Sequence, residues 1–263
     1  MAKHSRLWNR NIYDEYLRQG KGQGAGSDYE AWIRIQDFAS KGVVSRIKGR
    51  KTGRVHQLMS NNELAYFYHL DWSDDVLDIR EQYPLLDLDS AVAIAAQIGV
   101  KYPADKISGF PYVLTTDFMV TTRQGLKART IKMSAELNKK RVLEKLEIEK
   151  RYWDIHGIDW KIVTENEISY IKAKNIEWLY SAQDFNATNE STEIIRATET
   201  MLNMFETSEQ SVKTIAKIVE EKFLLAEGTG LHLFKYLTLN RKISFDLNET
   251  LDLNNTKKVW VIK

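Results

Sequence analysis

The order of strand-like and helix-like segments between residues 76 and 164 decides which fold class this chain can adopt. Four segments show the alternation or composition of strands: 76–82, 111–120, 127–133 and 160–164. Residues 135–157 instead carry apolar side chains at helical spacing. Strands interrupted by a long helix predict a mixed α/β domain built around a sheet.

Length and composition bound the rest. The chain has 263 residues, 43% hydrophobic and 28% charged, enough to bury a core in one large domain or two ordinary ones. It contains no cysteine, which excludes disulfides, a thiol nucleophile and every cysteine-ligated zinc or iron–sulfur site. The first ten residues lack the apolar core of a secretion signal, and no apolar run approaches the roughly 18 residues of a membrane helix. We therefore expect a soluble, cytoplasmic protein.

The last third of the chain is predicted to form a separate, smaller domain. Residues 183–192 are polar and aperiodic, as in a linker. Beyond them lie three helical patterns and two short strand signals: 192–205, 210–224, 230–240, 242–247 and 258–262. We predict a first domain at 1–181 and a winged-helix-like second domain at 182–263. The second carries 10 Lys and Arg against 12 Asp and Glu, which favours a protein contact over a tight grip on DNA.

Basic and acidic residues are segregated in the first half of the chain. Residues 1–60 carry 12 Lys and Arg against 5 Asp and Glu, whereas residues 61–120 carry 3 against 10. Basic side chains bind a polyanion by displacing its counterions, and a neighbouring acidic cluster is compatible with this when it binds divalent cations. Metal-dependent nucleases need both features, although ordinary fluctuation of surface charge explains the same counts.

The basic part contains the candidate DNA contacts. Residues 43–54 predict a strand–turn–strand, and the glycine-rich stretch 20–26 predicts a flexible arm, because its spacing matches no phosphate-binding loop. The residues expected to contact DNA lie in or beside these two segments: Lys21, Lys48, Arg50, Lys51, Arg54 and His56. A solvated hairpin without a ligand is the alternative explanation.

The predicted hairpin of the α/β domain contains a carboxylate and a lysine that can meet. A two-residue turn at Gln124-Gly125 places Asp117 opposite Lys132, with Thr130 on the same face. Such a pair is most often a surface ion pair. The apolar residues of both strands, however, predict that this pair lies partly out of water, which favours a function.

Ser60 and Glu63 form the pattern of a capping box at a helix start, so Glu63 has a structural role available. Glu63 and Asp117 can instead hold a hard divalent cation such as magnesium, whose bound water attacks a phosphodiester. Lys132 would activate that water or stabilise charge on the phosphorus oxygens. An Asp followed across a hairpin by X-x-Lys is the PD-(D/E)xK pattern of restriction-endonuclease-like nucleases, which alone is unspecific.

Longer stretches, in the same order along the chain, resemble the TnsA family, the endonuclease subunits of the heteromeric transposases of Tn-seven-like bacterial transposons. They are Gly22-Gln23-Gly24 with Asp28-Tyr29 and Trp32, KTGRVH at 51–56, NNELA at 61–65, LDIREQYPLL at 77–86, TTDF at 115–118, LEKLEIEKRYW at 143–153 and NIEWLYS at 175–181. LDIREQYPLL and LEKLEIEKRYW are long enough to be specific, whereas the residues after 181 resemble the family less.

The resemblance implies a restriction-endonuclease-like N-terminal domain and a small C-terminal domain. It implies a magnesium-dependent endonuclease, with Mn²⁺ able to substitute, that cuts double-stranded DNA at the 5′ ends of a transposon. It also implies two protein partners. A TnsB-type transposase cuts and joins the 3′ ends, and a TnsC-type AAA+ regulator engages the C-terminal domain.

The family motifs fall on particular residues of this chain. They imply that Glu63, Asp117 and Lys132 are catalytic. Glu63 and Asp117 are also the expected metal ligands, together with the main-chain oxygen of Ile131. Glu149 is expected near the site, with an exposed position on a helix as the alternative.

Three further positions concern the support of this site. Glu81 and Gln82 either support it or belong to a strand packed beside the hairpin. Thr130 departs from the family pattern, in which Gln or Glu is expected two positions before the lysine. If that position orients a metal-bound water, threonine weakens activity. A non-catalytic DNA-binding assembly factor that bridges the transposase and its regulator is therefore the alternative function, and a stand-alone restriction-type nuclease is a third.

Overall fold

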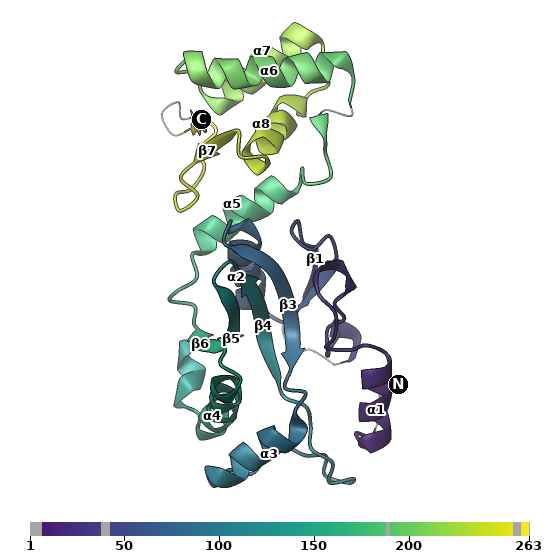
Figure 1. Ribbon diagram of the computed structural model, residues 1–263. Helices are drawn as coiled ribbons and strands as arrows, with labels where there is room; N and C mark the ends of the chain where they lie inside the picture. The colour runs from purple at the N-terminus through teal and green to yellow at the C-terminus, as the bar shows by residue number, and fades with distance from the viewer. Residues whose placement is uncertain (1–6, 38–42, 188–189, 255–258, 263) are drawn as a thin grey trace. The chain divides into compact units, whose positions relative to one another are not determined.

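The computed structural model describes residues 7–37, 43–187, 190–254 and 259–262, and the chain divides into two compact units, Met1–Ile168 and Ser169–Lys263 (Figure 1). The first unit contains, in chain order, α1 (Arg10–Arg18), β1 (Ser45–Lys48), β2 (Val55–Leu58), α2 (Asn61–Trp72), β3 (Val76–Pro84), α3 (Leu88–Gln97), β4 (Thr115–Thr122), β5 (Gly125–Ile131), α4 (Lys140–Ile155) and β6 (Asp159–Val163). Short 3₁₀ turns lie at Gly26–Asp28, Ile35–Asp37 and Ser134–Asn138.

A four-stranded mixed sheet forms the centre of the first unit. Its strand order is β3-β4-β5-β6, with β3, β4 and β5 antiparallel and β6 parallel to β5. A parallel pair needs a long crossover, and α4 supplies it. The mixed α/β prediction is confirmed, and so is the presence of the four strands. β1 and β2 form a separate antiparallel hairpin, as residues 43–54 predict.

Helices cover both faces of this sheet. Met119 of β4 and Ala128 of β5 are buried with apolar residues of α3 and α4, among them Ile94 and Ile148. On the next position along β4, the ring of Phe118 lies 5.8 Å from that of Tyr66 in α2. Successive residues of a strand point to opposite faces, so α2 and the α3–α4 pair enclose the sheet between them.

The glycine-rich stretch before β1 is folded back onto β3, which differs from the flexible arm expected. The Gly22 N–H donates to the Glu30 carbonyl at 2.6 Å. Gly22 has a φ of 73°, and a Cβ there would meet Pro84 Cγ at 2.3 Å. Only glycine permits this approach, so the stretch is a close-packed turn against the end of β3.

The second unit consists of α5 (Tyr170–Tyr180), α6 (Thr192–Thr207), α7 (Val212–Phe223), α8 (Thr229–Leu239) and an antiparallel hairpin of β7 (Ile243–Phe245) and β8 (Val259–Val261). The three helices and the hairpin expected after residue 190 are confirmed. Residues 188–189 of the expected linker and residue 258 of the expected last strand lie outside the described residues.

The division between the units falls before α5, whereas the sequence analysis places it after residue 181. The reason is that α5 is bonded to the end of the chain. The buried amide of Asn175 donates to the carbonyls of Leu247 and Glu249, at 2.8 Å each. These bonds are made over a distance in sequence that no local pattern reveals.

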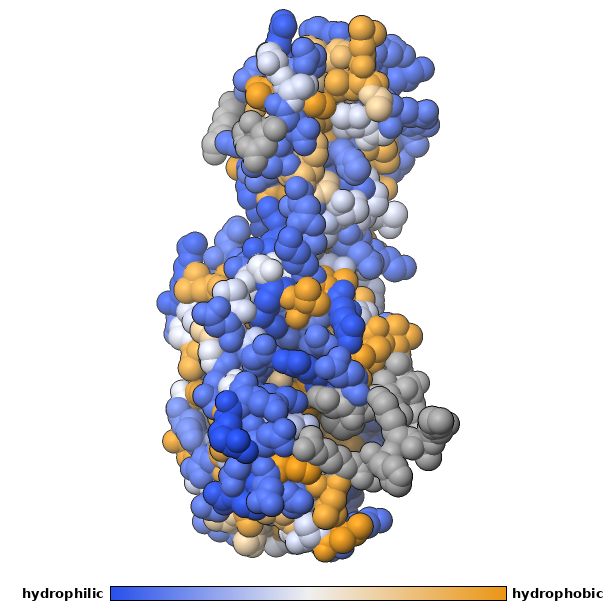
Figure 2. Space-filling view, turned by 90° about the vertical axis from the view of Figure 1, so that its right-hand side faces the viewer, coloured by the Kyte–Doolittle hydropathy of each residue, from blue (hydrophilic) through white to orange (hydrophobic). Residues whose placement is uncertain are grey.

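The surface of the first unit is mainly hydrophilic in the view of Figure 2, where apolar residues form small separate groups. Scattered exposed apolar residues such as Val55 and Leu77 are normal for a folded domain. Among the described residues, no helix combines the length and the apolar character needed to cross a membrane.

Candidate active site

Glu63 lies at the start of α2, where it caps the helix. Its N–H donates to the Ser60 hydroxyl at 3.2 Å, and that hydroxyl donates to Glu63 Oε1 at 3.0 Å. The other carboxylate oxygen, Oε2, accepts from the Met59 N–H at 2.9 Å. The capping role expected of Glu63 is confirmed, and it fixes a carboxylate that is 6% exposed.

Asp117 of β4 meets Lys132 just beyond the end of β5. Asp117 Oδ2 accepts from the Ile131 N–H at 2.6 Å and from the Lys132 ammonium at 3.3 Å. The ammonium also donates to the Ile131 carbonyl at 2.8 Å. The Asp117 side chain is 12% exposed and that of Lys132 30%, so the pair is partly enclosed, as its apolar neighbours predict.

The register of this hairpin differs from the expected one. Thr122 pairs with Gly125, so the turn falls one residue earlier than predicted. Continued along the strands, this register puts Asp117 opposite Thr130 and not opposite Lys132. The Thr122 hydroxyl donates to the Gly125 carbonyl at 2.9 Å and closes the turn there. Lys132 still reaches Asp117 because its four-carbon stem is long and flexible.

The electrostatics show that two carboxylates and one ammonium share this place. Burial, together with the charge of Asp117, raises the pKa of Glu63 to about 7. Burial by itself would lower the pKa of Lys132, but the charges of Asp117, Glu149 and Glu63 raise it. Lys132 is therefore a cation at neutral pH, and Glu63 is close enough to Asp117 to be repelled by it.

Glu149 of α4 is buried beside this group, which decides against the exposed helix position. Its Oε1 accepts hydrogen bonds from the Thr116 hydroxyl at 2.6 Å, from the indole of Trp160 at 3.0 Å and from the Thr130 hydroxyl. Burial raises the pKa of Glu149 to about 7 despite these donors. The hydroxyl of Thr130, the position that departs from the family pattern, thus serves Glu149.

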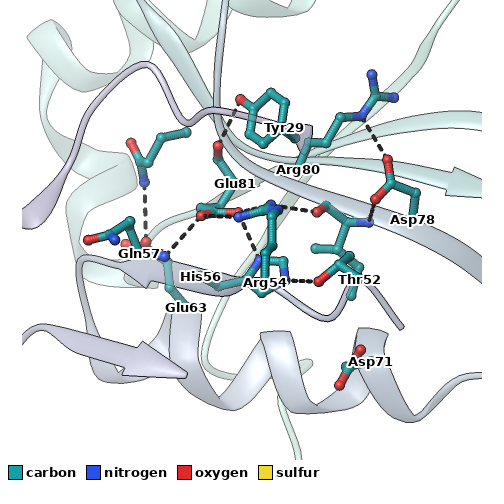
Figure 3. Close-up of polar contacts among 12 residues, drawn as sticks. Tyr29, Thr52, Arg54, His56, Gln57, Glu63, Asp71, Asp78, Arg80 and Glu81 are labelled. Carbon is teal, nitrogen blue, oxygen red and sulfur yellow. Dashed lines mark hydrogen bonds and ion pairs between the residues drawn. The ribbon is translucent and has the colours of Figure 1, made fainter. Parts of the chain in front are cut away.

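Glu81 of β3 is fully buried in a cluster of its own (Figure 3). Arg54 donates to both of its carboxylate oxygens, at 2.8 and 2.5 Å. His56 Nδ1 lies 2.8 Å from Oε2, and the Gln57 N–H donates to Oε1 at 2.9 Å. Burial alone would raise the pKa of Glu81, but Arg54 and His56 lower it to about 2.

Gln82, the next residue, has a different partner. Its amide donates to Glu63 Oε2 at 3.3 Å. Of the two neighbours considered in the sequence analysis, Gln82 therefore contacts a candidate catalytic side chain directly. Glu81 instead is bound by the β1–β2 hairpin.

Three of the expected DNA contacts are placed differently by the structure. His56 is completely buried, and the Arg54 side chain is 10% exposed and paired with Glu81. Lys21 is 7% exposed, and its ammonium lies 3.6 Å from the centre of the Tyr16 ring. All three point inward because they neutralise or cover buried partners that the basic pattern does not reveal.

The remaining expected contacts lie at the turn of the β1–β2 hairpin. Lys48 and Arg50 are exposed and Lys51 is half-buried. The N–H groups of Arg50 and Lys51 donate to the carboxylate of Asp71 at 2.9 and 3.1 Å. Asp71 thus orders a basic turn that the sequence analysis identified, yet no spacing pattern indicated Asp71 itself.

The donors available for a metal are oxygens. Among the described residues, no group of three or more His, Cys, Asp or Glu side chains is arranged to hold a metal ion. Two carboxylates, Glu63 and Asp117, lie close together, and the Ile131 carbonyl is bonded to the Lys132 ammonium that contacts Asp117. Hard oxygen ligands with room for several waters fit Mg²⁺, which seldom takes an all-protein cage.

Sequence comparisons match both units. The description "TnsA-like endonuclease N terminal" matches residues 73–165, and "TnsA endonuclease C terminal" matches residues 167–247. A curated protein of Escherichia coli, "Transposon Tn7 transposition protein TnsA", is 38% identical over 258 residues. The alignment covers 97% of this chain and 92% of that protein.

Proposed function

This chain belongs to the TnsA family of transposition endonucleases, and on that premise we propose that it cuts the 5′ ends of a transposon by metal-dependent hydrolysis during cut-and-paste transposition. The supporting observation is a contrast between two buried glutamates. Glu81 has a cationic partner in Arg54. Glu63 takes its hydrogen bonds from neutral groups and faces the carboxylate of Asp117. A divalent cation would neutralise this excess of negative charge.

Glu63, Asp117 and the Ile131 carbonyl would hold the magnesium ion, and manganese would substitute for it. The ion would supply Lewis-acid activation of water and of the phosphodiester. The Ile131 carbonyl has two lone pairs, so it can accept from Lys132 and still serve as a ligand. The capping contacts of Glu63 hold its carboxylate in one orientation before DNA arrives.

Lys132 would act through its charge. Because its pKa is raised, the ammonium keeps its proton at neutral pH and suits the stabilisation of negative charge on the phosphorus oxygens. This favours electrostatic stabilisation over activation of water, the other role considered for this lysine. Asp117 holds the ammonium in place through the 3.3 Å ion pair.

The threonine at position 130 does not weaken this proposal. Its hydroxyl is bonded to Glu149, and no described contact joins it to Glu63, Asp117 or Lys132. We infer that Thr130 acts on the site through Glu149. That carboxylate is fully buried, and its pKa of about 7 lets it hold a proton at neutral pH, which lowers the negative charge beside Asp117.

The finer fold assignment is part of the same proposal. An antiparallel β3-β4-β5 with α4 crossing to a parallel β6 supports a restriction-endonuclease-like first unit. Three helices followed by the β7–β8 hairpin support a winged-helix-like second unit. We propose that the first unit binds double-stranded transposon ends beside a TnsB-type transposase. The second unit would contact a TnsC-type AAA+ regulator.

The test is strand-specific cleavage in a reaction reconstituted with transposon-end DNA, Mg²⁺ and both partner types. Asp117→Asn keeps the shape of the side chain but removes the charge that binds metal. We expect it to abolish cutting at the 5′ ends and to leave cutting at the 3′ ends to the partner. Asp154→Asn, at an exposed position of α4, is the matched control and should cut normally.

Retention of 5′ cutting by Asp117→Asn would contradict the proposed site. If the wild-type chain made no 5′ cut but was still required for 3′ joining, the alternative function, a non-catalytic assembly factor, would replace it. Cutting without either partner would instead indicate a stand-alone nuclease.

A further inference from the structure

Gln82 is held in an unfavourable backbone conformation inside the first unit. Its φ is 48°, in the left-handed region that side chains other than those of Asn, Asp and Gly seldom adopt. It is 5% exposed, so the surface does not relieve the strain. Strain of this kind persists only where the surrounding structure imposes it, and it is concentrated at functional sites.

The preceding residue shows what imposes this conformation. The Glu81 carbonyl accepts from the Tyr29 hydroxyl at 3.0 Å, while the Glu81 carboxylate is bound by Arg54 and His56 (Figure 3). Main chain and side chain of Glu81 are thus fixed from two segments that lie before α2. The chain must leave this anchor in a set direction, and Gln82 takes up the distortion.

The distortion brings Gln82 between the two candidate metal-binding carboxylates. Glu81 pairs with Phe118 and Tyr83 with Thr116, which leaves Gln82 opposite Asp117 in the ladder. The side chain of Gln82 meanwhile reaches Glu63 in α2, so this one residue borders both carboxylates.

The orientation of the Gln82 amide follows from its two partners. Nε2 donates to Glu63 Oε2 at 3.3 Å, and Oε1 accepts from the Thr115 hydroxyl at 3.3 Å. An ionised carboxylate can only accept, so the NH₂ group must face Glu63. The amide therefore restrains the Glu63 side chain from the sheet, while Ser60 and Met59 restrain it from its own helix end.

We propose that Gln82 is a positioning residue for metal binding. Held by the Arg54–Glu81–His56 cluster, it orients the Glu63 carboxylate so that Glu63 and Asp117 receive one divalent cation together. This inference rests on the proposed function, since it needs a metal at these two carboxylates. A merely structural Gln82 would contribute to stability and leave metal affinity alone.

The test measures Mn²⁺ binding to the full-length protein without DNA, by electron paramagnetic resonance of the free ion. Gln82→Met keeps the length of the side chain and removes the donor. Gln82→Asn keeps the amide and tolerates a positive φ, but it is one methylene too short to make the same contact. Removing an outer partner of a metal ligand typically weakens metal binding about 10- to 100-fold, and we expect a loss in this range for both variants.

Two controls separate positioning from folding. Asp71→Asn disturbs a buried carboxylate that anchors the same β1–β2 hairpin from its turn, and it should leave Mn²⁺ affinity unchanged. Glu63→Ala should abolish binding at this site. Circular dichroism and thermal unfolding show whether each variant is folded, and Gln82→Asn decides the question if Gln82→Met does not fold.

The outcomes distinguish this inference from the function on which it rests. Wild-type binding that is lost in Glu63→Ala but unchanged in a folded Gln82 variant would overturn the positioning role and keep the proposed metal site. Failure of the wild-type protein to bind Mn²⁺, or binding that survives Glu63→Ala, would overturn both. Loss of affinity in the Gln82 variants with the Asp71 control unaffected would support the inference.

Discussion

The ionised Glu81 is expected to contribute a large, pH-dependent part of the stability of the first unit. Its pKa is lowered from an ordinary 4.5 to about 2, because Arg54 and His56 outweigh the effect of burial. At about 1.4 kcal/mol for each tenfold change in proton affinity, this gap corresponds to about 3 kcal/mol. Because the folded state binds the proton more weakly than the unfolded state, this stabilisation is complete above pH 4.5. It is lost as the pH falls towards 2.

Glu81→Gln removes the charge and nearly keeps the shape. We expect the free energy of unfolding at pH 7 to fall by about 3 kcal/mol, since Arg54 is left with no carboxylate partner in the cluster. The difference from wild type should shrink steadily between pH 4.5 and pH 2.5. Urea unfolding followed by tryptophan fluorescence at a series of pH values measures this difference.

Glu136→Gln is the matched control, because Glu136 forms an exposed ion pair with Lys139. Surface pairs of this kind contribute about 0–1 kcal/mol. The reasoning would be refuted if Glu81→Gln were as stable as wild type at pH 7. It would also be refuted if the loss stayed constant down to pH 2.5, because the charge of Glu81 would then not be its source.

Three further predictions concern DNA binding and the second unit. Replacing both Lys48 and Arg50 by Ala should weaken DNA binding and reduce the slope of log K against log salt by about 1.8, as for two lost phosphate contacts; a slope equal to that of wild type would remove them from the DNA interface. Leu224, at the end of α7, has a φ of 52° and is 93% exposed, so Leu224→Gly should raise the free energy of unfolding by about 0.5–1 kcal/mol in urea titrations, and a loss would contradict this. A Cβ at Gly230 would meet the Ala216 carbonyl oxygen at 2.5 Å, so Gly230→Ala should lower the thermal midpoint through a destabilisation of about 1–3 kcal/mol, whereas an unchanged midpoint would mean that α7 and α8 can separate at no cost.

Much of the candidate site could be identified before its geometry was known. Glu63, Asp117 and Lys132 lie in short motifs whose residue types suit metal-dependent hydrolysis, and the structure brings them together. The pairing by which Asp117 and Lys132 were expected to meet was wrong by two residues. The turn depends on the side chain of Thr122, which the position of the glycine alone did not reveal.

The basic residues show the limit of reading charge from sequence. Lys48 and Arg54 stand in the same basic segment and are equivalent as a pattern. One is exposed, whereas the other is bound to Glu81, which is 27 residues away along the chain. Charge counts cannot distinguish a cation that faces solvent from one that balances a buried acid, because that depends on long-range packing.

Local chemistry determined the elements, and long-range contacts determined the environment of each functional group. The Ser60 cap, the strand alternation and the helical spacing of α4 act within a few residues, so the sequence by itself specifies them. The opposite pKa shifts of Glu63 and Glu81, the strained Gln82 between the two carboxylates, and the attachment of α5 to the second unit all depend on partners distant in the chain. Burial and the nearest charge set the state of an acid, and only the tertiary structure decides both.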